Sequence, residues 1–211
     1  MVRTETCAYC GKPATTRDHV PPKKLFPRPW PDDLITVPAC DTCNNVPSGD
    51  DEYLIWVLTL VGTGPEAAKV RQQRLDKTQV TPRRRRMAAH IIDACTPANL
   101  VTPAGIYIGK GRAFNVDLLR LNRVLERIVR GLYFVEVRKP VPSHLEVTVM
   151  VEPPMILEVQ QGINSLVCRN PRSVAQGAFQ YWFGPAHDHP EAALCLMRFF
   201  GNILALGFVV D

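Results

Sequence analysis

Hydrophobic residues recur at helical spacing in the first two thirds of the chain. Between Leu118 and Leu132, leucine and isoleucine recur three and four positions apart, which is the period of an amphipathic helix. A nearly continuous apolar run follows Ser48 and an acidic turn, and it predicts a mostly buried helix that begins at Ser48. Two more helices are predicted behind prolines that suit the first helical position, over about 65–76 and 82–95.

The second half of the chain also carries the pattern of β-strands. Short runs of apolar, β-branched and aromatic residues are bounded there by glycine, proline and polar turns. The predicted strands are Gly105–Gly109, Tyr133–Val137, Leu145–Val151, Ala178–Phe183, Ala193–Phe200 and Leu204–Val210. This order of helices and strands predicts an α+β fold. We expect three segments: an N-terminal module over 1–62, a basic helical segment over 63–98 and an α+β domain over 99–211.

Composition excludes a disordered or membrane-spanning protein. Of the 211 residues, 46% are hydrophobic and 21% are charged, which is ordinary for a globular chain. The longest apolar runs fall well short of the roughly 20 residues that cross a bilayer. The first six residues lack the apolar core of a signal peptide. We therefore expect no membrane contact and a cytoplasmic location.

The positive charge is concentrated in one stretch. The chain carries a net charge of +5, and residues 65–90 hold eight basic residues against two acidic ones. Such a local field suits a polyanion such as nucleic acid, although a solvated helical face has the same pattern. A second arginine series, at 120, 123, 127 and 130, is interrupted by acidic residues, and we expect it to be a solvated face. The residues expected to contact nucleic acid are Arg17, Lys23, Lys24, Arg83, Arg84, Arg85 and Arg86.

Four of the seven cysteines have the spacing of a structural zinc site. Cys7 and Cys10 form one C-x2-C pair, and Cys40 and Cys43 form another after a gap of 29 residues. Two such pairs supply the four thiolates that Zn²⁺ binds tetrahedrally. A redox pair or disulfides would be the alternative, but a cytosolic chain disfavours disulfides. The remaining cysteines, at 95, 168 and 195, are expected to be small buried hydrophobic residues.

The gap between the two pairs contains residues suited to cleaving a phosphodiester bond. Asp18 and His19 stand side by side, and Asn44 follows Cys43 directly. Histidine can deprotonate water, whereas carboxylate and amide oxygens suit a hard cation such as Mg²⁺. In an extended segment over 15–20, Asp18 and His19 face opposite sides. The zinc is thus expected to be structural, with a second cation at Asp18 and Asn44; Asn45 is the competing ligand.

The order C-x2-C, Asp-His-Val-x-Pro, C-x2-C-Asn resembles the HNH endonucleases, which have the ββα-metal fold. The resemblance covers about residues 5–55 and is strongest to the zinc-stapled branch that includes the recombination endonuclease VII type. It implies an N-terminal nuclease module in which His19 is the general base and Asp18 and Asn44 bind catalytic Mg²⁺ or Mn²⁺. It also favours DNA over RNA as the substrate.

One residue of that family pattern is missing. The family places an asparagine about five residues before the third zinc cysteine, and this chain has none there. Asp33 or Thr36 is expected to replace it, because short polar side chains form the same local backbone bonds. The alternative function is a zinc-dependent protein that binds nucleic acid or a larger complex without cutting. A loop is expected at 187–189, and no chemistry is assigned to the C-terminal domain.

Overall fold

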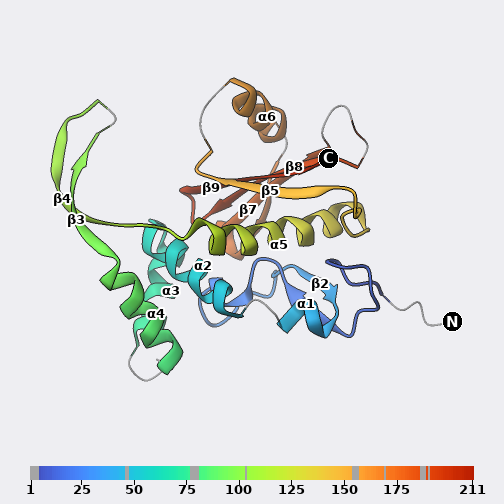
Figure 1. Ribbon diagram of the computed structural model, residues 1–211, viewed down its shortest axis with the longest axis horizontal. Coiled ribbons are helices and arrows are strands. Elements are labelled where there is room, and N and C mark those ends of the chain that lie inside the picture. The colour runs from blue at the N-terminus through green and yellow to red at the C-terminus, as the bar shows by residue number, and fades with distance from the viewer. Residues whose placement is uncertain are drawn as a thin grey trace.

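The computed structural model describes residues 5–45, 48–76, 81–102, 104–153, 157–168, 170–185, 189 and 191–211. A long helix, α5 (Leu118–Val137), crosses the middle of the molecule (Figure 1). The N-terminal elements pack on one side of α5 and a five-stranded sheet packs on the other. The protein is therefore a mixed α and β structure that is built around one helix.

The N-terminal part is a small β-hairpin followed by helices. Strand β1 (Thr16–His19) pairs antiparallel with β2 (Thr36–Ala39), so that Thr16 faces Ala39 and His19 faces Thr36. The short 3-10 helix η1 (Lys23–Leu25) lies in the connection, and helix α1 (Asp41–Asn45) follows β2 directly. The expected extended conformation around Asp18 is thus confirmed.

Three helices follow, as the hydrophobic pattern predicts. They are α2 (Ser48–Val61), α3 (Pro65–Leu75) and α4 (Pro82–Asp93). Helix α2 buries every residue from Glu52 to Thr59, and it packs against α5 and α3. Helix α4 ends two residues earlier than expected, because the chain enters a strand at Cys95.

A two-stranded ribbon comes next, and only part of it was predicted. Strands β3 (Cys95–Val101) and β4 (Tyr107–Phe114) pair antiparallel, so the strand expected at Gly105–Gly109 in fact runs on to Phe114. The β3 strand was missed because it follows the helical arginine run without a clear turn signal. Figure 1 shows the ribbon standing away from the rest of the molecule.

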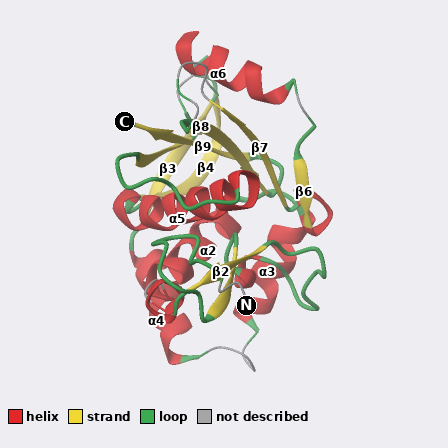
Figure 2. Ribbon diagram, turned by 90° about the vertical axis from the view of Figure 1, so that its right-hand side faces the viewer, coloured by secondary structure: helices red, strands yellow, loops and turns green. Residues whose placement is uncertain are grey.

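The C-terminal sheet is antiparallel, with the strand order β5-β9-β8-β7-β6. Its strands are β5 (Glu146–Val151), β6 (Arg172–Val174), β7 (Phe179–Pro185), β8 (Ala193–Phe199) and β9 (Ile203–Val210). Helix α5 covers one face and helix α6 (Leu157–Val167) the other (Figure 2). Four of these strands were predicted, whereas α6 and β6 were not; a further 3-10 turn, η2, spans Ala175–Gly177.

The strand predicted at Tyr133–Val137 is wrong, because these residues form the last turns of α5. Their aromatic and β-branched composition favours a strand. However, Tyr133 continues the apolar stripe of the helix and is buried in the core. The helix ends at Val137, and the C-cap residue Arg138 adopts a left-handed conformation with φ at 63°.

All three predicted segments contribute to one hydrophobic core. A single cluster of buried residues runs from Ala8 in the first segment through Ile91 in the second to Val209 in the third. Two glycines allow the layers to approach closely. A Cβ atom on Gly131 of α5 would lie 2.6 Å from Val20, and one on Gly207 of β9 would overlap Val129. Among the described helices, none is both long and apolar enough to cross a membrane.

We expect the Gly131→Ala variant to be less stable than the parent. Alanine in a helix is normally better than glycine by about 1 kcal/mol, but here the added methyl group overlaps Val20. Overpacking of this kind costs about 1–3 kcal/mol, so urea denaturation should show a net loss. Gly162→Ala in α6 is the control, since its Cβ would make an ordinary 3.5 Å contact with Leu194; it should stabilise. A gain for both variants would contradict the close approach.

Candidate functional site

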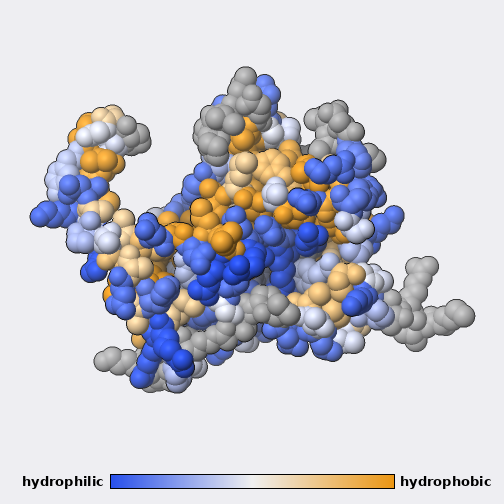
Figure 3. Space-filling view, viewed as in Figure 1, coloured by the Kyte–Doolittle hydropathy of each residue, from blue (hydrophilic) through white to orange (hydrophobic). Residues whose placement is uncertain are grey.

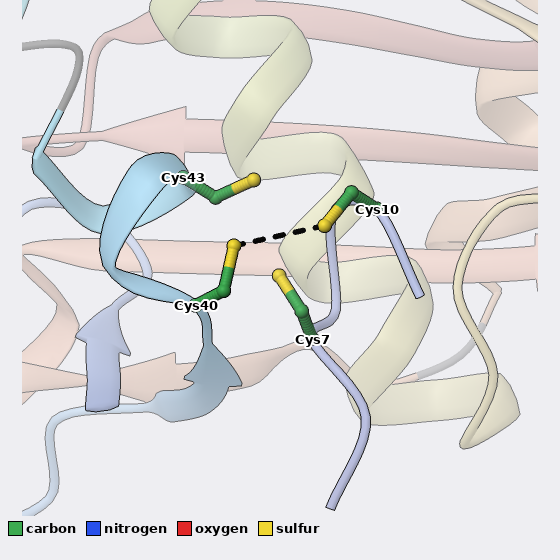
Figure 4. Close-up of side chains that lie close together, drawn as sticks. All are labelled: Cys7, Cys10, Cys40 and Cys43. Atoms are coloured by element: carbon green, nitrogen blue, oxygen red, sulfur yellow. Dashed lines mark hydrogen bonds between the residues drawn. The ribbon is translucent and has the colours of Figure 1, made fainter. Parts of the chain in front are cut away.

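The four predicted zinc cysteines lie together (Figure 4). The sulfur atoms of Cys7, Cys10, Cys40 and Cys43 all lie within 4.8 Å of one another, and the Cys10 and Cys40 sulfurs are 3.7 Å apart. Thiolates arranged tetrahedrally at about 2.3 Å from zinc are themselves about 3.8 Å apart. The cluster therefore fits a metal ion such as zinc.

Each cysteine pair is shaped by local backbone hydrogen bonds. In the first pair, Cys7 N–H donates to the carbonyl of Lys12 at 2.7 Å, and Gly11 N–H donates back to Cys7 at 3.0 Å. Gly11 has φ at +71°, a conformation that glycine adopts without strain. In the second pair, helix α1 begins directly after Cys40, so the next turn carries Cys43 alongside it. Both turns thus direct their sulfur atoms to one point.

The pKa values of the two cysteines of the second pair are shifted in opposite directions by their surroundings. A backbone N–H from Cys43 lowers the pKa of Cys40 to about 7. Burial raises the pKa of Cys43 well above its ordinary value. Four thiols this close cannot all ionise without a compensating cation. A bound metal would supply that charge.

Strand β1 presents the Asp18–His19 pair beside this cluster. The Oδ1 atom of Asp18 accepts a hydrogen bond from the backbone N–H of His19 at 2.9 Å. Its Oδ2 atom accepts one from the hydroxyl of Tyr9 at 2.6 Å and one from Arg127 at 2.5 Å. The carboxylate is therefore fixed in orientation by residues from both halves of the chain.

Asn44 lies against the same strand. Its amide nitrogen donates to the hydroxyl of Thr16 at 3.0 Å and to the carbonyl of Arg17 at 3.3 Å. A carbonyl oxygen can only accept, so these bonds identify the nitrogen end of the amide. The other end of the amide is therefore the Oδ1 atom. The nitrogen end is held against Arg17, which directly precedes Asp18. Asn45, the competing ligand, is exposed at the end of α1.

His19 ends strand β1 and is half-buried. Burial lowers its pKa, as does the nearby ammonium group of Lys23, while Asp18 opposes both. Within the described residues, nothing hydrogen-bonds to its imidazole ring. Burial and Lys23 thus favour the neutral form of the imidazole, which can accept a proton.

The two residues expected to replace the missing asparagine have other partners. Asp33 accepts a hydrogen bond from the backbone N–H of Ala175 at 2.9 Å and so ties the connection between β1 and β2 to the sheet. The hydroxyl of Thr36 accepts one from the Arg17 side chain at 3.2 Å. Thr36 faces His19 only through the backbone pairing of β1 and β2.

The prediction that the arginine series of α5 is a solvated face is wrong for Arg120 and Arg127, whose side chains are 23% and 15% exposed, whereas the Arg123 side chain is 60% exposed. Arg120 and Arg123 both bind the Asp50 carboxylate, at 2.8 and 2.9 Å. Arg127 pairs with Asp18, and only 15% of each of these two side chains is exposed. The error arises because the acidic partners lie far away in sequence. Arg127 and Asp18 are 109 residues apart.

A second acidic side chain lies close to Arg127. The Oδ1 atom of Asp51 is 3.8 Å from Arg127, and burial raises the pKa of Asp51 to about 6. The charges of Arg127 and Lys24 act against that rise, whereas Asp18 adds to it. Arg127 therefore separates two carboxylates that would otherwise repel each other. The sequence gives no signal for this arrangement of Arg127 between two carboxylates. The sequence does show that Tyr9 lies between Cys7 and Cys10.

The residues expected to contact nucleic acid are spread over several places. Arg17 forms an ion pair with Glu5 at 3.2 Å, and the Lys23 ammonium group lies 3.7 Å from the centre of the Trp30 ring. Arg85 and Arg86 are exposed on α4. The side chains of Arg83 and Arg84 lie outside the described part of the structure.

A hollow of about 430 Å³ lies between the second cysteine pair and α5. Its wall includes Cys43, Tyr9 and three arginines, at 123, 127 and 130, together with Asp50 and Glu126. It thus adjoins both residues that bind the Oδ2 atom of Asp18. The charges in its wall have both signs.

The remaining sequence expectations have mixed outcomes. Cys195 is buried as expected, Cys95 is half-buried, and Cys168 is exposed, contrary to expectation. The expected loop at 187–189 lies largely outside the described residues. The chain matches no protein-family model, no curated protein and no solved structure.

Loss of one cluster cysteine should abolish metal binding and unfold the N-terminal part. Structural zinc contributes about 10–16 kcal/mol in small zinc domains, so Cys40→Ser should lose the metal and melt at a much lower temperature. Mass spectrometry of the metal content and a thermal melt by circular dichroism measure both effects. Cys168→Ser, at an exposed cysteine outside the cluster, is the control. An unchanged metal content and an unchanged melting temperature in Cys40→Ser would contradict the assignment of the cluster as a metal site.

Removal of the Arg127 charge should destabilise the protein strongly. In Arg127→Met, the carboxylates of Asp18 and Asp51 lose the cation between them, and breaking such a buried pair costs about 3–5 kcal/mol. Arg130→Met is the matched control on the same helix and should change the free energy of unfolding by less than about 0.5 kcal/mol. Adding Asp51→Asn to Arg127→Met should restore part of the loss. Equal denaturation midpoints for the two arginine variants would contradict this assignment.

Proposed function

We propose that this chain is a metal-dependent endonuclease of the HNH type that hydrolyses phosphodiester bonds in nucleic acid, with DNA favoured. The observation that carries the proposal is the anchoring of Asn44 on strand β1, through Thr16 and Arg17. It anchors Asn44 on the strand that carries Asp18 and His19, although Asn44 and His19 lie 25 positions apart in the sequence. A β-hairpin and a following helix thus carry all three side chains.

The proposal gives His19 the role of general base. Its neutral imidazole would take a proton from the attacking water, a task that suits a histidine near neutral pH. Lys23 lies close enough to depress the pKa of His19, and it would also attract the phosphate. His19, at the end of β1, would hold this proton while the phosphodiester bond breaks.

Asp18 and Asn44 would hold the catalytic Mg²⁺ or Mn²⁺. Both offer the oxygen donors that such hard cations prefer. Asp18 Oδ1 accepts one hydrogen bond, from the backbone N–H of its own neighbour, which would leave a lone pair for a cation. The hydrogen bonds of Asn44 use its amide nitrogen, which would leave Oδ1 available as a ligand. When bound, the cation would stabilise the charge that develops on the phosphate oxygens. Tyr9 and Arg127 would keep the Asp18 carboxylate oriented through its other oxygen.

The metal of the cysteine cluster would be zinc, and its role would be structural. Four sulfur ligands fill a tetrahedral site and leave no open position for a substrate. A metal bound by the cluster would fix the start of α1, which carries Asn44, relative to the turn that carries Tyr9. Zinc would therefore set the geometry of the catalytic residues without taking part in the reaction.

A second candidate function is binding of nucleic acid without cleavage. The ion pair between Arg127 and Asp18 favours it, because the guanidinium already neutralises the Asp18 carboxylate and would repel a cation at its other oxygen. In that case the zinc cluster and the basic helices would serve binding alone. Cleavage and binding must therefore be measured separately.

His19→Ala should abolish cleavage and leave folding and zinc content intact. Loss of a general base lowers the rate by about 10²–10⁴-fold, which nicking of supercoiled plasmid in Mg²⁺ or Mn²⁺ would reveal. His144→Ala is the matched control, since His144 is half-exposed and its imidazole pairs with Glu191 of the C-terminal part of the chain. Equal rates for parent and His19→Ala would refute the mechanism. Binding by a parent that never cuts, with either cation, would favour the second candidate.

A further inference from the structure

The projecting ribbon of β3 and β4 has an unusual surface. Neither strand packs substantially against another element within the described residues. Five large apolar side chains near its end are between 48% and 67% exposed: Leu100, Val101, Ile106, Tyr107 and Ile108. Figure 3 shows hydrophobic surface on the ribbon that stands apart at one edge of the molecule. An isolated two-stranded ribbon is marginally stable, so this surface needs a partner.

One face of the ribbon is basic. Lys110 pairs with Asn99, and Arg112 pairs with Pro97, so the two cations lie two residues apart on the same face. Both are exposed. The other face consists of small residues, and Leu100 covers Gly111 there. The ribbon therefore presents two cations along one side and apolar groups at its end.

The surrounding sequence extends this charge. Residues 94–116 contain no aspartate or glutamate, and residues 82–114, which add helix α4, contain six basic residues and one acidic residue. That excess equals the net charge of the whole chain, +5. A second copy of the chain would bring this positive surface against itself, which like-charge repulsion opposes. A polyanion would be attracted to it.

We propose that the β3–β4 ribbon is an arm that grips duplex nucleic acid. Lys110 and Arg112 contact phosphates along the duplex, and the apolar end, with Ile106 at its tip, enters a groove. Proteins that bend or clamp DNA insert apolar side chains of this kind between base steps, while cations on the flanks neutralise the backbone. The inference rests on the proposed function only in taking nucleic acid as the ligand, because it requires no cleavage.

The full-length protein can be tested with a fluorescein-labelled 30-base-pair DNA duplex. Fluorescence anisotropy is measured over a range of salt concentrations, without added Mg²⁺ or Mn²⁺. Each phosphate contact contributes about 0.9 to the slope of log K against log salt. The double variant Lys110→Gln/Arg112→Gln should therefore lower that slope by about 2. Lys12→Gln/Lys139→Gln removes the same charge at the opposite end of α5, where Gly11 meets Pro140, and should leave the slope closer to that of the parent.

The apolar end is tested by Ile106→Ser, a change at an exposed position that should not affect folding. It should weaken duplex binding about tenfold, the value of burying one isoleucine side chain, without changing the salt slope. Unchanged binding by both arm variants would overturn the proposal, as would a parent that binds no duplex. It would equally be overturned if the parent sediments as a dimer that Ile106→Ser dissociates with no effect on DNA binding.

A plasmid assay on the same proteins separates this inference from the proposed function. If the parent binds DNA through the arm but does not cut the plasmid, the arm proposal stands and the nuclease proposal fails. If the Lys110→Gln/Arg112→Gln variant cuts as fast as the parent at salt concentrations where binding limits the rate, the nuclease proposal stands and the arm proposal fails.

Discussion

The close approach of four thiols is the constraint on which the N-terminal structure depends. Sulfur atoms within 4.8 Å of one another need a cation between them to be stable as thiolates. The hairpin that they adjoin has only four residues in each strand, too few to hold its shape alone. A metal bound at this point would tie the turn around Cys7 to the start of α1. The positions of Tyr9 and Asn44 follow from that tie.

Helix α5 supplies the second half of the support. Its apolar side faces the hairpin, α2 and the sheet, while three of its arginines reach acidic residues of the N-terminal part. Burial raises the pKa of Asp50, but the hydrogen bonds from Arg123 and Arg120 outweigh that effect and leave it lowered. The adjacent Asp51, with weaker compensation, has a raised pKa. Stability and the orientation of Asp18 thus depend on the same helix.

The sequence predicts what is local and misses what joins distant segments. The cysteine spacing leads to the cluster, and the period of the leucines leads to α5, because both signals depend on neighbouring positions. The partners of Asp18 could not be found in the same way. Arg127 lies 109 residues away, and its place in a helix with alternating charges resembled an ordinary solvated surface. The end of α5 was misjudged because Tyr133 and Val137 suit a strand in composition, whereas the core determines their structure.

The shared core has a consequence for any attempt to transplant the N-terminal module. Val20 packs on Gly131, Ala8 and Tyr53 belong to the same buried cluster as the sheet residues, and the Asp18 carboxylate takes its counterion from α5. A fragment ending near residue 62 would therefore carry bare apolar faces and an uncompensated acid. In this chain the hairpin and cysteine cluster are not an interchangeable cassette. Grafted onto another scaffold, they would need a substitute for α5 as well as their metal.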